Sequence, residues 1–162
     1  MLGIGSSLFY PNEHEQMYSL GLGGTYDYLN MNEHLSAVYA DSFTYAWWMK
    51  PDDGQPGATQ YILGSLNNSE EDGFSVALMG SGGICLYQAS NGDTARFCTD
   101  AAVFDDGAVD WTHLAITATK NTSGNTAYKV YVNGSAVAGT LTDAVSDTNH
   151  ALYNSEDTVY IG

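Results

Sequence analysis

Basic residues are scarce in this sequence. Four of its 162 residues are Lys or Arg, against 19 Asp and Glu, and the formal net charge is -15. A charge of this sign and size repels phosphate backbones and anionic lipid surfaces. We therefore expect no binding to nucleic acid. The charge by itself selects no other ligand.

Long apolar runs are also missing. No run approaches the roughly 20 residues that a membrane-spanning helix needs, so we expect no membrane insertion. Residues 1–16 have no basic n-region and only a short, glycine-rich apolar stretch, so we expect no secretory signal peptide there. Three prolines against 18 glycines and 12 tyrosines favour short strands joined by tight turns over helices.

The clearest strand pattern lies between Trp111 and Leu141. Apolar residues occupy every second position from 113 to 118 and from 127 to 133, the period of a strand with one buried face. Asn133-Gly134 supplies two residues that accept positive φ, as two-residue hairpin turns require. A third strand is predicted from 135 to 140, which makes this stretch a β-meander.

Other apolar runs of strand length are separated by turn residues, so they predict one all-β domain over residues 17–162, preceded by an arm at 1–16. These runs are 17–22, 25–31, 42–50, 58–66, 73–79, 83–88, 95–99 and 158–162. The run 42–50 carries large side chains on both faces, because Phe43 and Trp47 alternate with Trp48. It is either a central strand covered on both sides or a strand with one face lining a groove.

The two cysteines flank a predicted tight turn. If Asn91-Gly92 forms a two-residue turn, antiparallel pairing brings Cys85 opposite Cys98. The pair then falls at a non-hydrogen-bonded position, where Cα atoms approach to about 4.5 Å. A disulfide accepts Cα separations of roughly 4.4 to 6.8 Å. We predict a Cys85–Cys98 disulfide; two reduced thiols in contact are the alternative, and two thiols are too few ligands for a zinc site.

Five segments, taken in order, resemble the laminin G-like branch of the concanavalin A-like lectin and glucanase superfamily. They are YSLGLGGTYDYLNM, FTYAWWMKP, WTHLAITAT, YKVYVNGSAVA and VYIG, and they span residues 17–162. The resemblance implies an antiparallel jelly-roll β-sandwich. It also implies that Trp48 and Trp111 are packing residues. Family members continue past the last segment into a final strand, which we expect to be missing here.

The same resemblance suggests two kinds of ligand. Calcium is a candidate because the fold often carries it and aspartates follow or precede two strands, although these residues also form turns; the aspartates are Asp52, Asp53, Asp105, Asp106 and Asp110. No other cofactor is expected. Sugars are a candidate because exposed aromatic rings could stack on pyranoses, although most aromatics of a sandwich belong to its core; the candidate rings are Tyr45, Trp47, Tyr128 and Tyr131.

Catalysis is not expected. A glucanase of this superfamily needs paired carboxylates on one strand, in a pattern resembling E-x-D-x-x-E, because acid and nucleophile must face the same glycosidic bond. The sequence has no such spacing, and no serine, cysteine or acid stands at motif spacing from His113.

Two functions follow from the resemblance. The opening MLGIGSSL is similar to the start of laminin G-like proteins of marine tailed phages. This predicts a non-enzymatic structural protein on the virion surface, a capsid decoration or tail domain. Its partners would be other virion proteins or its own copies, with weak adhesion to host glycans. The alternative is a carbohydrate-binding adhesion module of an extracellular or cell-surface protein.

Overall fold

The protein is a β-sandwich. Its computed structural model describes residues 19–22, 27–31, 42–65, 73–90, 93–120, 126–143 and 158–162. The described residues form eleven strands and contain no helix, and therefore no helix that could span a membrane. The strands are β1 (Leu29–Asn30), β2 (Phe43–Met49), β3 (Gln60–Gly64), β4 (Gly73–Leu78), β5 (Ile84–Ser90), β6 (Asp93–Thr99), β7 (Thr112–Lys120), β8 (Thr126–Val132), β9 (Ser135–Val137), β10 (Gly139–Asp143) and β11 (Tyr160–Ile161).

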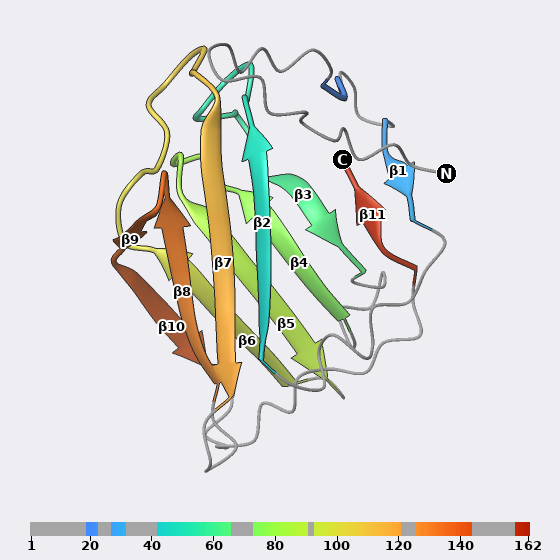
Figure 1. The fold of residues 1–162 in the computed structure, drawn as a ribbon, viewed down its shortest axis with the longest axis vertical. Coiled ribbons are helices and arrows are strands. Elements are labelled where there is room, and N and C mark those ends of the chain that lie inside the picture. The colour runs from blue at the N-terminus through green and yellow to red at the C-terminus, as the bar shows by residue number, and fades with distance from the viewer. Residues whose placement is uncertain are drawn as a thin grey trace, which may run out of the picture.

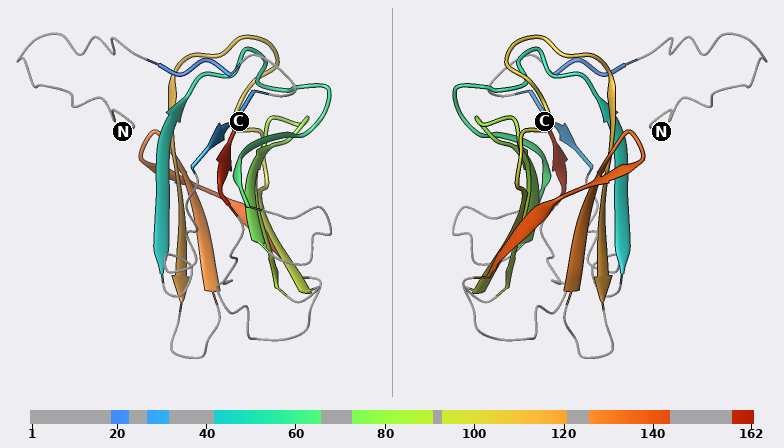
Figure 2. Two further views of the ribbon diagram at one scale, coloured as in Figure 1. Left: turned by 90° about the vertical axis from the view of Figure 1, so that its right-hand side faces the viewer. Right: turned by 90° about the vertical axis from the view of Figure 1, so that its left-hand side faces the viewer.

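The strands form two antiparallel sheets. One has seven strands in the order β1-β11-β3-β4-β5-β6-β10, and the other has four in the order β2-β7-β8-β9. Figure 1 looks onto the four-stranded sheet, and Figure 2 shows the two layers edge-on. The all-β fold and the jelly-roll sandwich predicted from the sequence are confirmed.

The core lies between the sheets and follows the period-two pattern. Every second residue of β2, β4, β5, β7 and β8 points inward, because successive side chains of a strand face opposite sides. The largest fully buried side chains are Phe74, Val76, Ile84, Cys85, Leu86, Leu114, Ile116, Val130 and Val159. Cys85 is the exception among them, because it alternates with Ile84 and Leu86 and so lies on the outer side of its strand.

The hairpin of β5 and β6 has the predicted register. Cys85 pairs with Cys98, and the last pair before the turn is Ser90 with Asp93. The two cysteines form a disulfide, with their Cα atoms 4.1 Å apart. The redox state of the protein in its own environment stays a prediction.

The predicted strand 135–140 is wrong as a single strand. β9 pairs with β8 in the four-stranded sheet, whereas β10 crosses over and pairs with β6 in the seven-stranded sheet. The change of sheet occurs at Gly139, where an added Cβ would lie 2.5 Å from Cζ of Phe97. Only a residue without a side chain lets the backbone pass this ring.

The N-terminal part of the predicted pattern is only partly found. Residues 19–22 form no strand, and of the strand expected at 25–31 the described residues 27–31 contain β1. The arm expected at 1–16 lies outside the described residues. β2 lies at the edge of the described four-stranded sheet, and Trp48 on its outer face is 57% exposed, so the strand is not covered on both faces among the described residues.

Candidate functional site

On the outer face of the four-stranded sheet, Tyr131 stands among small residues. Tyr131 of β8 pairs with Ala115 of β7 on one side and with Ala136 of β9 on the other. Ala115 in turn pairs with Ala46 of β2. Because directly paired residues point to the same face, these three methyl groups leave the half-buried ring of Tyr131 standing above its surroundings.

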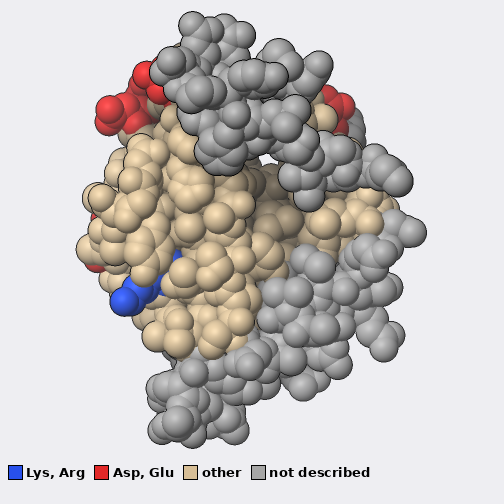
Figure 3. Space-filling view, in the orientation of Figure 1, with Lys and Arg blue, Asp and Glu red and all other residues tan. Residues whose placement is uncertain are grey.

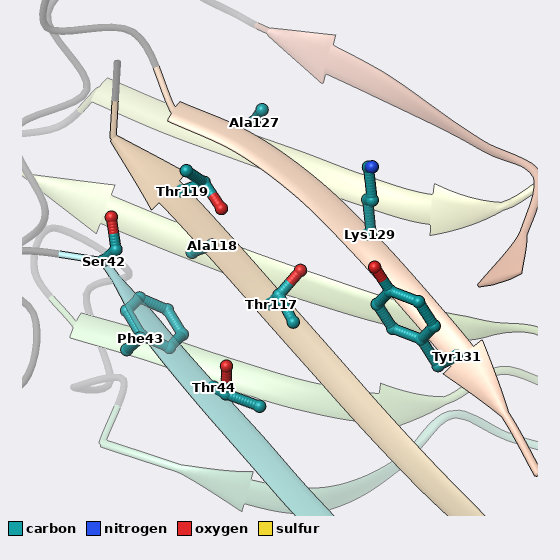
Figure 4. A pocket seen from close by; sticks show the side chains of 9 residues that line it. All are labelled: Ser42, Phe43, Thr44, Thr117, Ala118, Thr119, Ala127, Lys129 and Tyr131. Atoms are coloured by element: carbon teal, nitrogen blue, oxygen red, sulfur yellow. The ribbon is translucent and has the colours of Figure 1, made fainter. Parts of the chain in front are cut away.

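A shallow hollow lies beside this ring. Its volume is about 490 Å³, and hydroxyl groups from three strands point into it (Figure 4). The register places Thr44, Thr117 and Lys129 in one row across β2, β7 and β8. The residues that line the hollow are Ser42, Phe43, Thr44, Thr117, Ala118, Thr119, Ala127, Lys129 and Tyr131. We call it the Tyr131 hollow.

Lys129 provides the positive charge of the Tyr131 hollow. Its side chain is exposed, and within the residues that the structure describes its ammonium group has no ion-pair partner. In Figure 3 uncharged residues cover most of the described surface on this side, while acidic residues gather at the upper end. The residues lining the hollow include no acid, although the chain holds 19. Lys129 is therefore free to donate hydrogen bonds to a ligand.

Two tryptophans are exposed, Trp48 further along the same face and Trp111 directly before β7. Trp48 is 57% exposed and Trp111 is 41% exposed, so neither is the packing residue that the resemblance implies. Trp48 pairs with His113, and the two rings lie 5.2 Å apart between centroids. The sequence indicates the outward direction of one of these rings, because Trp47 and Trp48 are consecutive residues of a strand and must face opposite sides.

Of the four predicted sugar-stacking rings, only Tyr131 lies on the outer face. Tyr45 and Trp47 point inward and pack against the core, where Tyr45 stacks on Phe74 with 5.6 Å between ring centroids. Tyr128 is 7% exposed, and its hydroxyl donates a hydrogen bond to Oε1 of Gln88 in the opposite sheet. These three rings hold the two layers together. Tyr45 and Trp47 are partly buried and Tyr128 is buried, so they offer a sugar less surface than Tyr131 does, and sugar stacking by these three rings stays a prediction.

The predicted calcium ligands do not converge. Within the described residues no three His, Cys, Asp or Glu side chains come close enough to hold a metal ion, and this range contains Asp52, Asp105, Asp106 and Asp110. Oδ1 of Asp53 accepts hydrogen bonds from the backbone N–H groups of Gln55, at 2.9 Å, and Gly107, at 3.2 Å. The first bond closes the turn after β2, and the second ties that turn to the segment before β7. Calcium binding at these aspartates stays a prediction.

Sequence reasoning named Tyr131 but missed the polar residues around it. The opposite sides of β8 were readable, since Lys129 and Tyr131 alternate with Val130 and Val132. The contribution of Thr44 could not be predicted from the sequence, because it depends on β2 pairing with β7, which lies more than sixty positions later in the chain. Long-range pairing of this kind follows from no local pattern.

A comparison with protein families gives one match. The profile described as "Concanavalin A-like lectin/glucanases superfamily", of the laminin G-like type, covers residues 23–162. The chain belongs to this superfamily. The laminin G-like resemblance is thereby confirmed, and no curated protein matches the sequence.

Solved structures of the superfamily fold include two of a carbohydrate-binding module. These are the CBM40 of the IT-sialidase of Ruminococcus gnavus, bound to α2,6-sialyllactose in one case. The bound form has 19% sequence identity and a TM-score of 0.52, over 80% of this chain and 72% of that chain. The second structure has 18% identity and a TM-score of 0.51, over 80% and 71%. At this identity the likeness shows the shared fold alone.

Proposed function

We propose that this chain is a non-catalytic carbohydrate-binding module of an extracellular or cell-surface protein, and that it holds a glycan in the Tyr131 hollow. The observation that carries the proposal is the composition of the hollow: the ring of Tyr131, threonine hydroxyl groups from β2 and β7, and the ammonium group of Lys129, which has no ion-pair partner among the described residues. The similar fold of a module that binds sialyllactose supports it.

Each part of the hollow suits a sugar. The ring of Tyr131 offers an apolar face to the C–H side of a pyranose and keeps its hydroxyl for hydrogen bonding. Thr44, Thr117 and Thr119 can donate to or accept from sugar hydroxyls, and Lys129 donates only. The volume of about 490 Å³ lies within the range of roughly 300 to 1,000 Å³ typical of small-molecule sites.

The same composition argues against hydrolysis. A glycosidase needs two carboxyl groups flanking the scissile bond, about 5 to 9.5 Å apart. The lining of the hollow contains no Asp, Glu or His. A ligand held there would meet donors, acceptors and an aromatic ring but no acid or nucleophile.

The findings support this function better than the virion role, which remains a prediction from the resemblance of residues 1–8. Glycan binding by the isolated chain distinguishes the two functions. A printed glycan array, followed by calorimetric titration of the best ligand, should show binding by the isolated chain. Binding should fall at least tenfold in Tyr131→Ala and persist in Tyr131→Phe, which keeps the ring.

Tyr160→Ala is the matched control, since Tyr160 is an exposed tyrosine of the other sheet, at 41%. This variant should bind as the unmodified chain does. No binding to any arrayed glycan would refute the proposed function. Equal loss in Tyr131→Ala and Tyr160→Ala would refute the location.

A further inference from the structure

The outer face of the four-stranded sheet carries a second exposed ring beyond the Tyr131 hollow. Trp48 of β2 is 57% exposed and lies two residues after Ala46, on the same side of the strand. Ala46 pairs with Ala115 of β7, which pairs with Tyr131 of β8. Trp48 and Tyr131 therefore lie diagonally across three neighbouring strands, about 12 Å apart between Cα atoms at the usual strand spacing and rise per residue.

The surface between the two rings is open to solvent. Ala46 is exposed and Ala115 is half-buried, and their methyl groups border the diagonal on the side of the Tyr131 hollow. The half-buried imidazole of His113 borders it on the other side. Figure 2 shows the sheet edge-on, with β2 and β7 running straight beside each other. A flat ligand can therefore lie across these strands from Tyr131 to Trp48.

His113 supports the indole of Trp48 from one side. The two rings lie 5.2 Å apart between centroids and are tilted by 59°. The backbone of His113 is held in turn, because its N–H donates to Oδ1 of Asn133 at 3.0 Å and its C=O accepts the N–H of Asn133 at 2.8 Å. A ring that is already held in place loses less freedom when a ligand covers it. Trp48 is therefore a prepared stacking surface.

The order of side chains along this face indicates how a ligand lies on it. Thr44, Thr117 and Lys129 form a polar row, Tyr131 belongs to the next row, and Trp48 to the row after that. An aromatic ring offers its apolar face to the C–H side of a pyranose. Trp48 is too distant for the sugar that stacks on Tyr131, so a glycan reaches both rings only as a chain. Equatorial β-1,4 linkages keep such a chain in a flat ribbon, whereas axial linkages curl it.

We propose that this face binds a linear oligosaccharide of at least three equatorially linked sugars, with one sugar stacked on Tyr131 and another on Trp48. The inference rests on the proposed function and adds to it the length and the shape of the ligand. Trp48 then determines the preference for chain length. The Tyr131 hollow can still bind a short glycan if the extension to Trp48 is wrong.

The test is calorimetric titration of the full chain with di-, tri- and tetrasaccharides of four series. Three are β-1,4-linked and built from glucose, xylose or N-acetylglucosamine, and the fourth is the α-1,4-linked malto-oligosaccharides. We expect at least one β-1,4 series to bind at least tenfold more tightly as the tetrasaccharide than as the disaccharide. The malto series should show no such gain.

Three variants locate the gain. In Trp48→Ala it should fall below threefold, whereas the affinity for the disaccharide should not change. Trp48→Phe keeps a ring and should retain part of the gain. Tyr61→Ala is the matched control, since Tyr61 is 54% exposed on the other sheet, and it should retain all of it.

Should Trp48→Ala melt lower than the unmodified chain, the indole N–H signal of Trp48 in the unmodified chain decides instead. This signal should shift when the tetrasaccharide is added and stay in place with the disaccharide. An unshifted signal would overturn the inference.

The outcomes separate this inference from the proposed function. Disaccharide binding that depends on Tyr131 but does not strengthen with chain length would overturn the inference and leave the proposed function standing. A gain that survives in Trp48→Ala would do the same. Failure of all three β-1,4 series to bind would also overturn the inference, while the glycan array decides the proposed function. A dimer in sedimentation equilibrium that Trp48→Ala dissociates would show that a second copy covers this ring, which contradicts the inference.

Discussion

Replacing both cysteines, as Cys85→Ala with Cys98→Ala, tests what the cross-strand bond contributes to stability. The bond closes a loop with a sequence separation of 13 residues. Restricting the unfolded chain by a loop of this size stabilises the folded state by about 3 kcal/mol at 25 °C. For a chain of this length each kcal/mol shifts the melting midpoint by roughly 2 to 4 °C, so the double variant should melt about 6 to 12 °C lower.

Thermal unfolding followed by circular dichroism, with and without reductant, separates the cross-link from the loss of sulfur atoms. The oxidised unmodified chain should melt highest. Adding reductant should lower its midpoint towards that of the double variant, whereas the midpoint of the double variant should not respond. Equal midpoints for the oxidised chain and the double variant would refute the reasoning. So would two freely alkylated thiols in the native protein.

Three further results are expected. Tyr128→Phe should lower the free energy of unfolding by about 1 to 3 kcal/mol in urea titrations, because it leaves the buried Oε1 of Gln88 unpaired. Tyr131→Phe on the outer face is the control, and it should change the free energy of unfolding by less than about 0.5 kcal/mol. Gly139→Ala should cost about 1 to 3 kcal/mol in the same titrations, since its Cβ would collide with the ring of Phe97; an unchanged midpoint would contradict the sheet change at this residue. Melting midpoints with calcium and with chelator should agree, because the described carboxylates do not converge; a rise of several degrees with calcium would contradict this.

Local patterns in the sequence predict much of the fold. Asn133 and Gly134 both have positive φ, at 48° and 82°, and Asn133 Oδ1 accepts the backbone N–H of His113. A turn with this chemistry fixes the register of the strands it joins. The same logic brought Cys85 opposite Cys98. Where a tight turn joins two strands, counting residues outward from the turn predicts which residues pair and which face of the sheet each side chain is on.

What the sequence does not predict depends on contacts between distant segments. Nothing local to 135–140 indicates that the chain changes sheets, since the collision that selects Gly139 involves Phe97, about forty residues earlier. The Tyr131 hollow needs β2 beside β7. Tyr128 and Tyr131, by contrast, are separated by local alternation, because Tyr128 shares the side of the apolar Val130 whereas Tyr131 shares the side of Lys129.

The central claim is that the outer face of the four-stranded sheet binds a glycan at Tyr131. Its most direct test is calorimetric titration of the best arrayed ligand into the unmodified chain, Tyr131→Ala and Tyr160→Ala, after confirming equal melting midpoints. We expect the dissociation constant to rise at least tenfold for Tyr131→Ala alone. Unchanged affinity in that variant would contradict it.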